Sequence, residues 1–251
     1  MDQDDDGAGG TIDRDEVARF SALASRWWDE DGEFRPLHRI NPVRLEFLRE
    51  RLVRHFAREP RDLAPFRGLS LVDIGCGGGL VAEPMARLGF SVTGLDADPE
   101  TLAVGRAHAA AQGLRIDYRC ETAEALAASG VQFDAVLALE VMEHVRDVPL
   151  FVAACARLLR PGGAFLASTI NRTPRSFVLA IAGAEYVLRW LPRGTHRWDR
   201  FLRPSEVAAA LRGNGLEPRE FAGLVFDLLH GSWGLSSDLA VNYLVFATQT
   251  K

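Results

Sequence analysis

From residue 69 onward, short apolar runs alternate with amphipathic segments. Each run spans five to eight residues and is rich in apolar and β-branched side chains, a pattern typical of buried strands. The segments between the runs predict helices, among them one from Asp98-Pro99 to Gly113 and one over 148–160. The runs are LSLVDIG at 69–75, FSVTGLD at 90–96, IDYRC at 116–120, FDAVLALE at 133–140 and AFLASTI at 164–170.

This alternation predicts a parallel sheet with helices on both faces. Right-handed crossover connections make such a sheet doubly wound. Near the end of the chain, a predicted helix at 205–213 is followed by two more strands, at 219–227 and 241–249. No helix separates these two strands, so we expect one of them to run antiparallel. The pattern therefore predicts an α/β fold with a doubly wound, mostly parallel seven-stranded sheet.

The N-terminal part of the chain predicts helices instead of strands. Its first helix is expected over 13–31, where apolar residues recur at spacings of three and four. A loop with two prolines follows at 34–42. Asn41 is expected to cap a second helix there, and Pro42 to be its first helical residue. The apolar residues of the first helix are Val17, Phe20, Leu23 and Trp27.

Composition favours a globular protein with one domain. The 251 residues are 47% apolar and 25% charged, with a net charge of −5, which excludes a disordered chain, a collagen and a small disulfide scaffold. No apolar run reaches the roughly 20 residues of a membrane span. The three cysteines lie far apart, as is typical of reduced thiols in the cytosol. We expect a disordered acidic leader at 1–12, without a signal-peptide pattern, and a domain at 13–251 with a helical cap at 13–66.

The candidate chemistry begins at the end of the first predicted strand, where residues 73–79 read D-x-G-x-G-x-G. Glycines such as Gly75 and Gly77 let a backbone turn tightly and approach a ligand closely. A dinucleotide-binding turn needs glycine or alanine where this chain has Leu80, which argues against a nicotinamide enzyme. Asp96 lies at the tip of the second strand, where it can accept both hydroxyls of a ribose. This combination resembles the class I S-adenosylmethionine methyltransferases.

Longer motifs along the chain indicate one family within that class. They are WWD, FRPLHRINPVR, LVDIGCGGGL, VTGLDADP, LEVMEHV, STINRT and GAEYVLRWLPRGTH. Together they resemble the ubiquinone biosynthesis O-methyltransferases over nearly the whole chain. The resemblance implies a Rossmann-like fold and methylation of polyprenyl catechols and 3-demethylubiquinol. It also implies that S-adenosylmethionine is the cofactor, leaving as S-adenosylhomocysteine, and that Arg44 pairs with its carboxylate. The other contacts expected with the cofactor come from Gly75, Gly77, Asp96 and Leu139.

A second polar group, E-x-x-E-H, follows the fourth predicted strand. Spacings of three and four on a short helix would place Glu140 beside Glu143 and His144. Two carboxylates and an imidazole can hold Mg²⁺ or another divalent ion, which would lower the pKa of a bound phenol. Alternatively, His144 acts alone as the general base. The third interpretation is a polar helix start whose carboxylates are favoured by the helix dipole.

The segment at 172–203 differs in character from the rest of the chain. It carries seven arginines against Glu185 and Asp199, a net charge of +5, and its stretch at 176–191 is strongly apolar. Such a mixture predicts an amphipathic helical insert that binds an anionic membrane surface, or a lid or subunit contact that never meets lipid. Because the arginines lie beside apolar residues, we do not expect nucleic-acid binding.

Three functions fit these observations. The first is an O-methyltransferase of ubiquinone biosynthesis, cytoplasmic and peripherally associated with the inner face of the membrane, where a polyprenyl substrate resides. The second is a small-molecule methyltransferase of another pathway. The third is a non-catalytic scaffold of a quinone-biosynthesis complex. The intact glycine turn, Asp96 and E-x-x-E-H argue against a scaffold, which would not need them.

Overall fold

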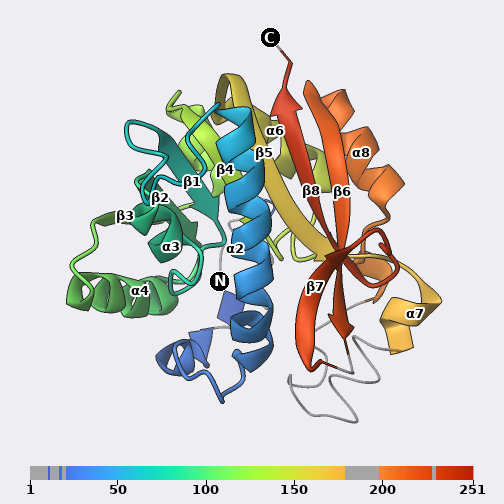
Figure 1. Ribbon diagram of the computed structural model, residues 1–251, viewed down its shortest axis with the longest axis horizontal. Helices are drawn as coiled ribbons and strands as arrows, with labels where there is room; N and C mark the ends of the chain where they lie inside the picture. The colour runs from blue at the N-terminus through green and yellow to red at the C-terminus, as the bar shows by residue number, and fades with distance from the viewer. Residues whose placement is uncertain (1–10, 12–16, 19–20, 179–197, 228–229, 251) are drawn as a thin grey trace, which may run out of the picture.

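The computed structural model of the chain describes residue 11 and residues 17–18, 21–178, 198–227 and 230–250 (Figure 1). Within these residues, eight strands form one sheet in the order β3-β2-β1-β4-β5-β8-β6-β7. The α/β prediction is confirmed. The strands are β1 Ser70–Ile74, β2 Ser91–Asp96, β3 Ile116–Cys120, β4 Phe133–Leu139, β5 Leu159–Ile170, β6 Leu216–Asp227, β7 Ser232–Ser236 and β8 Asn242–Gln249.

The predicted count of seven strands was one too low. The additional strand, β7, pairs antiparallel with β6 from Gly223 opposite Ser236 to Asp227 opposite Ser232. Its sequence SWGLS contains a glycine and no β-branched side chain, so it does not stand out as a strand. β8 runs antiparallel to both β5 and β6, which confirms that one of the two predicted C-terminal strands reverses direction.

Helices cover both faces of the sheet (Figure 1). The helices α2, α3 and α4 contribute to the buried clusters on one face, and α5, α6 and α8 to the cluster on the other. Asp98 caps α4 and Asp147 caps α6 through backbone N–H groups, as their positions before proline-containing first turns favour. The bounds are α2 Arg35–His55, α3 Ala82–Arg87, α4 Pro99–Ala111, α5 Ala123–Ala128, α6 Val148–Arg157 and α8 Pro204–Gly213.

The N-terminal helices differ from the prediction. α2 begins at Arg35, with Phe34 as its N-cap residue, so Asn41 and Pro42 lie inside the helix and not at its start. Pro36 lies in the first turn of α2, where the missing backbone N–H of a proline costs no hydrogen bond. The Asn41 side chain donates a hydrogen bond to the carbonyl of Leu80 at 3.0 Å. A tertiary contact therefore replaces the local capping role that an Asn-Pro pair predicts.

The helix predicted over 13–31 does not continue to its expected end. A short 3₁₀ helix, η1, spans Ala24–Arg26, and turns follow it up to α2. The Asp29 carboxylate accepts the N–H of Asp31 at 3.2 Å and pairs with Arg26, which favours a turn over a continued helix. The rest of this prediction, and the leader expected at 1–12, lie mostly outside the described residues.

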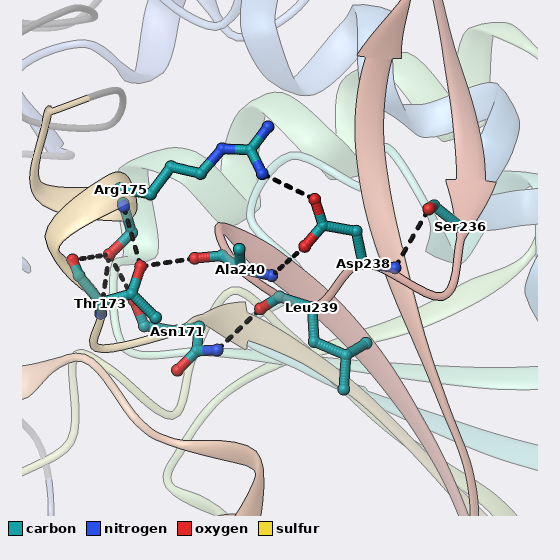
Figure 2. A network of polar contacts seen from close by, with 8 residues as sticks. Asn171, Thr173, Arg175, Ser236, Asp238, Leu239 and Ala240 are labelled. Carbon is teal, nitrogen blue, oxygen red and sulfur yellow. Dashed lines mark hydrogen bonds and ion pairs between the residues drawn. The ribbon is translucent and has the colours of Figure 1, made fainter.

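The insert predicted at 172–203 is described only at its two ends. At its first end, Asn171 and Thr173 donate side-chain hydrogen bonds to the carbonyls of Leu239 and Ala240, at 2.7 and 2.6 Å (Figure 2). At its second end, Trp198 Nε1 donates to the carbonyl of Thr173 at 3.2 Å. The two ends therefore lie together beside the β7–β8 connection, while residues 179–197 lie outside the described part. No helix in the described part is long and apolar enough to cross a membrane.

Candidate active site

One cavity of about 340 Å³ lies at the carboxyl ends of β1, β2 and β4. Ligands of open α/β sheets bind at this edge, where the loops after the strands meet. This cavity is lined by residues that lie far apart in the sequence. They come from α2, from the glycine turn and the strand after it, and from the end of β4 with the E-x-x-E-H motif. They are Arg44, Gly75, Asp96, Leu139, Glu140, Glu143 and His144.

The glycine turn after β1 holds the carboxylate of Asp96 in place. Gly75 and Gly77 have φ values of 67° and 52°, a backbone conformation that favours glycine. The N–H of Gly77 donates to Asp96 Oδ2 at 2.8 Å, and the N–H of Asp98 donates to Oδ1 at 3.0 Å. Gly77 is not among the residues that line the cavity, so a direct contact between Gly77 and the cofactor stays a prediction.

A second carboxylate, Asp73, lies beside Asp96 and is only 3% exposed. Burial, together with repulsion from Asp96, raises the pKa of Asp73 to about 7, although Arg44 and the N–H of Ala82 oppose the shift. Burial also raises the pKa of Asp96. Within the described residues, Oδ2 of Asp73 has no hydrogen-bond partner. The site therefore holds more negative charge than its described cationic partners offset.

The third carboxylate, Glu140, is held by side chains from two distant elements. Arg44 Nη2 and the Ser168 hydroxyl each donate to Glu140 Oε1 at 2.7 Å. Burial alone would raise the pKa of Glu140, but the charge of Arg44 and these hydrogen bonds hold it below its ordinary value. Glu140 has a φ of 55°, an unusual conformation for a residue other than glycine, and strain of this kind is concentrated at functional sites.

Glu143 and His144 follow in a turn and not on the short helix that was predicted. The Glu143 carboxylate is 4% exposed and accepts the hydroxyl of Thr169 at 2.7 Å. Burial and repulsion from Glu140 raise the pKa of Glu143 to about 7. The segment nevertheless brings all three side chains of E-x-x-E-H to the cavity wall.

Comparison with known proteins identifies the family. The chain is 54% identical to a ubiquinone biosynthesis O-methyltransferase of Azorhizobium caulinodans, over 95% of this chain and 94% of that protein. It is 53% identical to the same enzyme of Methylobacterium nodulans, over 95% and 96% of the two chains. The chain belongs to the ubiquinone biosynthesis O-methyltransferase family. The profile of a methyltransferase domain matches residues 72–167, from β1 into β5.

Solved structures share the fold of this O-methyltransferase. Magnesium protoporphyrin IX methyltransferase from Synechocystis, solved with bound S-adenosylhomocysteine, matches with a TM-score of 0.64 at 16% identity. The match covers 94% of this chain and all of the other. A possible histamine N-methyltransferase from Thermotoga maritima matches with a TM-score of 0.59 at 18% identity, over 94% and 99% of the two chains. At these identities the likeness establishes the fold alone.

The next feature of this O-methyltransferase is the set of acidic and histidine side chains in its described residues. In the described part of the chain, no group of three or more histidine, cysteine, aspartate or glutamate side chains is arranged to hold an ion. Glu140 is engaged by Arg44 and Ser168, and Glu143 by Thr169. In the described structure these carboxylates therefore act as ion-pair and hydrogen-bond partners. The assignment of Glu140, Glu143 and His144 as metal ligands stays a prediction.

Sequence reasoning missed two parts of the cavity wall. One is the start of α5, where Glu121, Thr122 and Ala123 line the cavity and Thr122 caps the helix. A threonine before an acidic first turn was the available signal, but a helix of six residues is too short for a periodicity. The other part is the cap, where Trp27 and Phe34 line the cavity. Their placement depends on the turns that replace the predicted helix.

Proposed function

We propose that the chain is an S-adenosylmethionine-dependent O-methyltransferase of ubiquinone biosynthesis, which methylates phenolic hydroxyls of polyprenyl catechol and 3-demethylubiquinol intermediates. The observation that carries this proposal is one cavity that joins Asp96, beside the glycine turn, to His144. The carboxylate of Asp96 suits a nucleoside, and the imidazole of His144 suits proton removal from a phenol. The names of the relatives at 53–54% identity support the reaction, and the bound ligand of the Synechocystis enzyme supports the cofactor.

The side of the cavity that holds Asp96, Asp73 and Arg44 suits the ribose and the amino-acid part of S-adenosylmethionine. Asp96 has both oxygens fixed by backbone N–H groups and can accept the ribose hydroxyls with its remaining lone pairs. Asp73 has a buried oxygen without a partner among the described residues, and it suits the ammonium group. Arg44 is 4% exposed, and its Nε likewise has no described acceptor, which suits the carboxylate. Leu139 and Gly75 complete the wall.

The opposite side of the cavity suits the phenol. S-adenosylmethionine supplies a methyl group on a sulfonium, whose sulfur leaves as a neutral thioether. A phenol has a pKa of about 10, so its proton must be removed as the oxygen bonds to the methyl carbon. His144 lines the cavity, and we assign it as the base that accepts this proton, a contribution of roughly 10²–10⁴ in rate. The charge of His144 in turn opposes the rise in the pKa of the neighbouring Glu143.

Whether a divalent cation assists is a separate question with its own test. Methylation is measured after EDTA treatment and after Mg²⁺ is restored, with S-adenosylhomocysteine binding measured in parallel. Loss of methylation, rescued by Mg²⁺ while binding persists, would support Glu140, Glu143 and His144 as ligands. Full activity in EDTA would leave His144 as a base without metal.

We further propose that the insert at 172–203 brings the enzyme to the inner face of an anionic membrane, where a polyprenyl substrate resides. Its charge of +5 and apolar stretch support this location, and the described flank exposes Phe177 and Val178 by 47% and 57%. Cosedimentation with anionic and neutral vesicles tests it, with stronger recovery on anionic vesicles expected. Equal recovery on both would count against the arginines. Assembly into a quinone-biosynthesis complex stays a prediction.

Transfer of a labelled methyl group tests the main proposal. The protein is incubated with methyl-labelled S-adenosylmethionine and a short-chain 3-demethylubiquinol, whose solubility removes any need for a membrane. We expect label in the methyl ether product. If the protein binds S-adenosylhomocysteine but transfers no label to this phenol, then the second candidate, a methyltransferase of another pathway, becomes the better interpretation.

A further inference from the structure

Four residues that line the cavity each carry a buried polar atom without a hydrogen-bond partner among the described residues. Two of these atoms are donors, Trp27 Nε1 and Arg44 Nε, and two are carboxylate acceptors, Glu33 Oε2 and Asp73 Oδ2. A buried donor without an acceptor costs about 1–3 kcal/mol, so such atoms persist where a ligand completes them. Two donors and two carboxylate oxygens in one cavity suit a ligand group that carries both a negative and a positive charge, with the donors available to its anionic part.

Trp27 lies directly against the glycine turn. A Cβ atom added at Gly77 would lie 2.1 Å from Cη2 of Trp27, and one added at Gly78 would lie 2.4 Å from Cδ1. The indole therefore lies across both glycines, and neither position has room for a side chain while Trp27 remains there. The absence of a side chain at Gly77 and Gly78 is thus explained by the tryptophan as well as by the turn.

The cap holds this tryptophan in a defined position. Its ring packs against Phe34 with 4.3 Å between ring centroids, and its carbonyl lies 2.9 Å from Nε2 of His38. The neighbouring Trp28 points elsewhere and stacks on His108 of α4, with ring centroids 3.6 Å apart and planes 12° from parallel. Trp27 itself is 9% exposed. Nε1 of Trp28 also has no partner among the described residues, but Trp28 does not line the cavity, so only Trp27 is placed to meet a ligand there.

We infer that Trp27 is a cofactor-binding residue that closes the amino-acid end of the cavity and donates its Nε1–H to the carboxylate of S-adenosylmethionine, beside Arg44. Tryptophan has only a donor to offer, so its partner must be an acceptor. The carboxylate is the anionic group of this cofactor. This inference rests on the proposed function, because it requires that the cofactor occupies this cavity.

The test compares two ligands and two tryptophan variants by calorimetry. S-adenosylhomocysteine carries the carboxylate, whereas 5′-methylthioadenosine keeps the adenine, ribose and sulfur but lacks the amino-acid end. Trp27→Phe retains a ring over the glycines and removes the N–H. We expect it to bind S-adenosylhomocysteine roughly 10-fold more weakly, as for a lost hydrogen bond to a charged group, with 5′-methylthioadenosine affinity unchanged. Trp28→Phe is the matched control and should bind both ligands like the wild type.

A second variant guards against a folding defect in the first. Gly78→Ala leaves the indole intact but displaces it, and it should give the same selective loss. Equal weakening of both ligands, wild-type affinity for S-adenosylhomocysteine, or an equal effect of Trp28→Phe would overturn the inference. The proposed function fails differently, because wild-type protein would then bind neither ligand.

Discussion

The cavity contains two acidic regions that are built in different ways. On one side, Asp96 is held by backbone N–H groups of Gly77 and Asp98, within about 20 residues of sequence. On the other side, Glu140 is held by Arg44 and Ser168, which lie 96 and 28 residues away in the chain. The first region is built by a local turn, and the second by side chains that meet only when the sheet and α2 have packed.

The two regions also differ in how their charge is offset. Glu140 has an arginine partner, and its pKa is held below the ordinary value. Asp73 lies against Asp96, and burial raises its pKa to about 7. The difference indicates that the charge of Glu140 is offset within the protein, whereas Asp73 keeps an oxygen for a ligand group with a positive charge.

The largest expected effect comes from breaking the Glu140 pair. Arg44→Ala leaves a buried carboxylate without its cation, so we expect the free energy of unfolding to fall by about 3–5 kcal/mol in urea denaturation. The control is Arg175→Ala, which breaks the exposed pair with Asp238 at the same 2.7 Å separation (Figure 2). It should cost about 1 kcal/mol or less. Equal losses would show that burial of the Glu140 pair is unimportant.

A smaller effect on binding is expected from the acid at the tip of β2. Asp96→Ala removes a charged acceptor from the ribose, so S-adenosylhomocysteine binding should weaken by about 1–3 kcal/mol in calorimetry. Asp147→Ala removes the N-cap of α6 instead and should lower stability by about 1 kcal/mol without changing affinity. Unchanged affinity in Asp96→Ala would remove Asp96 from the cofactor site.

The smallest effect is a pH dependence of the free energy of unfolding, to which Asp73 contributes. Because the pKa of Asp73 is raised from 3.8 to about 7 in the folded protein, the folded state retains its proton longer than the unfolded state. Asp73 should therefore lower the stability of the ligand-free protein as pH rises from about 4 through about 7, and this one group contributes at most about 1.4 kcal/mol per pH unit.

Asp73→Asn keeps the shape of this side chain and removes its titration. Urea denaturation at pH 6 and pH 8 should show a smaller loss of stability in Asp73→Asn than in the wild type, because Glu143 continues to titrate in both. The same loss in both proteins would show that Asp73 does not carry a raised pKa.

Gly75 and Asp96 belong to the part of the site that is built locally, whereas Arg44 was predicted only through the family resemblance. Gly75 and Asp96 could be placed because a strand, a glycine turn and a second strand determine their positions over short stretches. α4 could be placed because Asp98 precedes Pro99 and caps its own helix. The position of the turn could therefore be predicted without any tertiary contact.

The parts that were missed depend on distant contacts. Asn41 and Pro42 favour a helix start, yet α2 runs through both of them, and Asn41 bonds to Leu80. β7 becomes a strand by pairing with β6. The role of Trp27 depends on a turn at Asp29 that redirects the chain, and no periodicity of apolar residues reveals such a turn. In each case tertiary packing overrides the local preference.

The central claim is that Asp96, Asp73 and Arg44 hold the cofactor while His144 removes the phenol proton. Single-turnover transfer of a labelled methyl group by His144→Ala, with S-adenosylhomocysteine affinity measured on the same protein, tests this division directly. The account predicts transfer at least about 100-fold slower than in the wild type at unchanged affinity. Transfer at the wild-type rate, or a loss of affinity equal to the loss of rate, would contradict it.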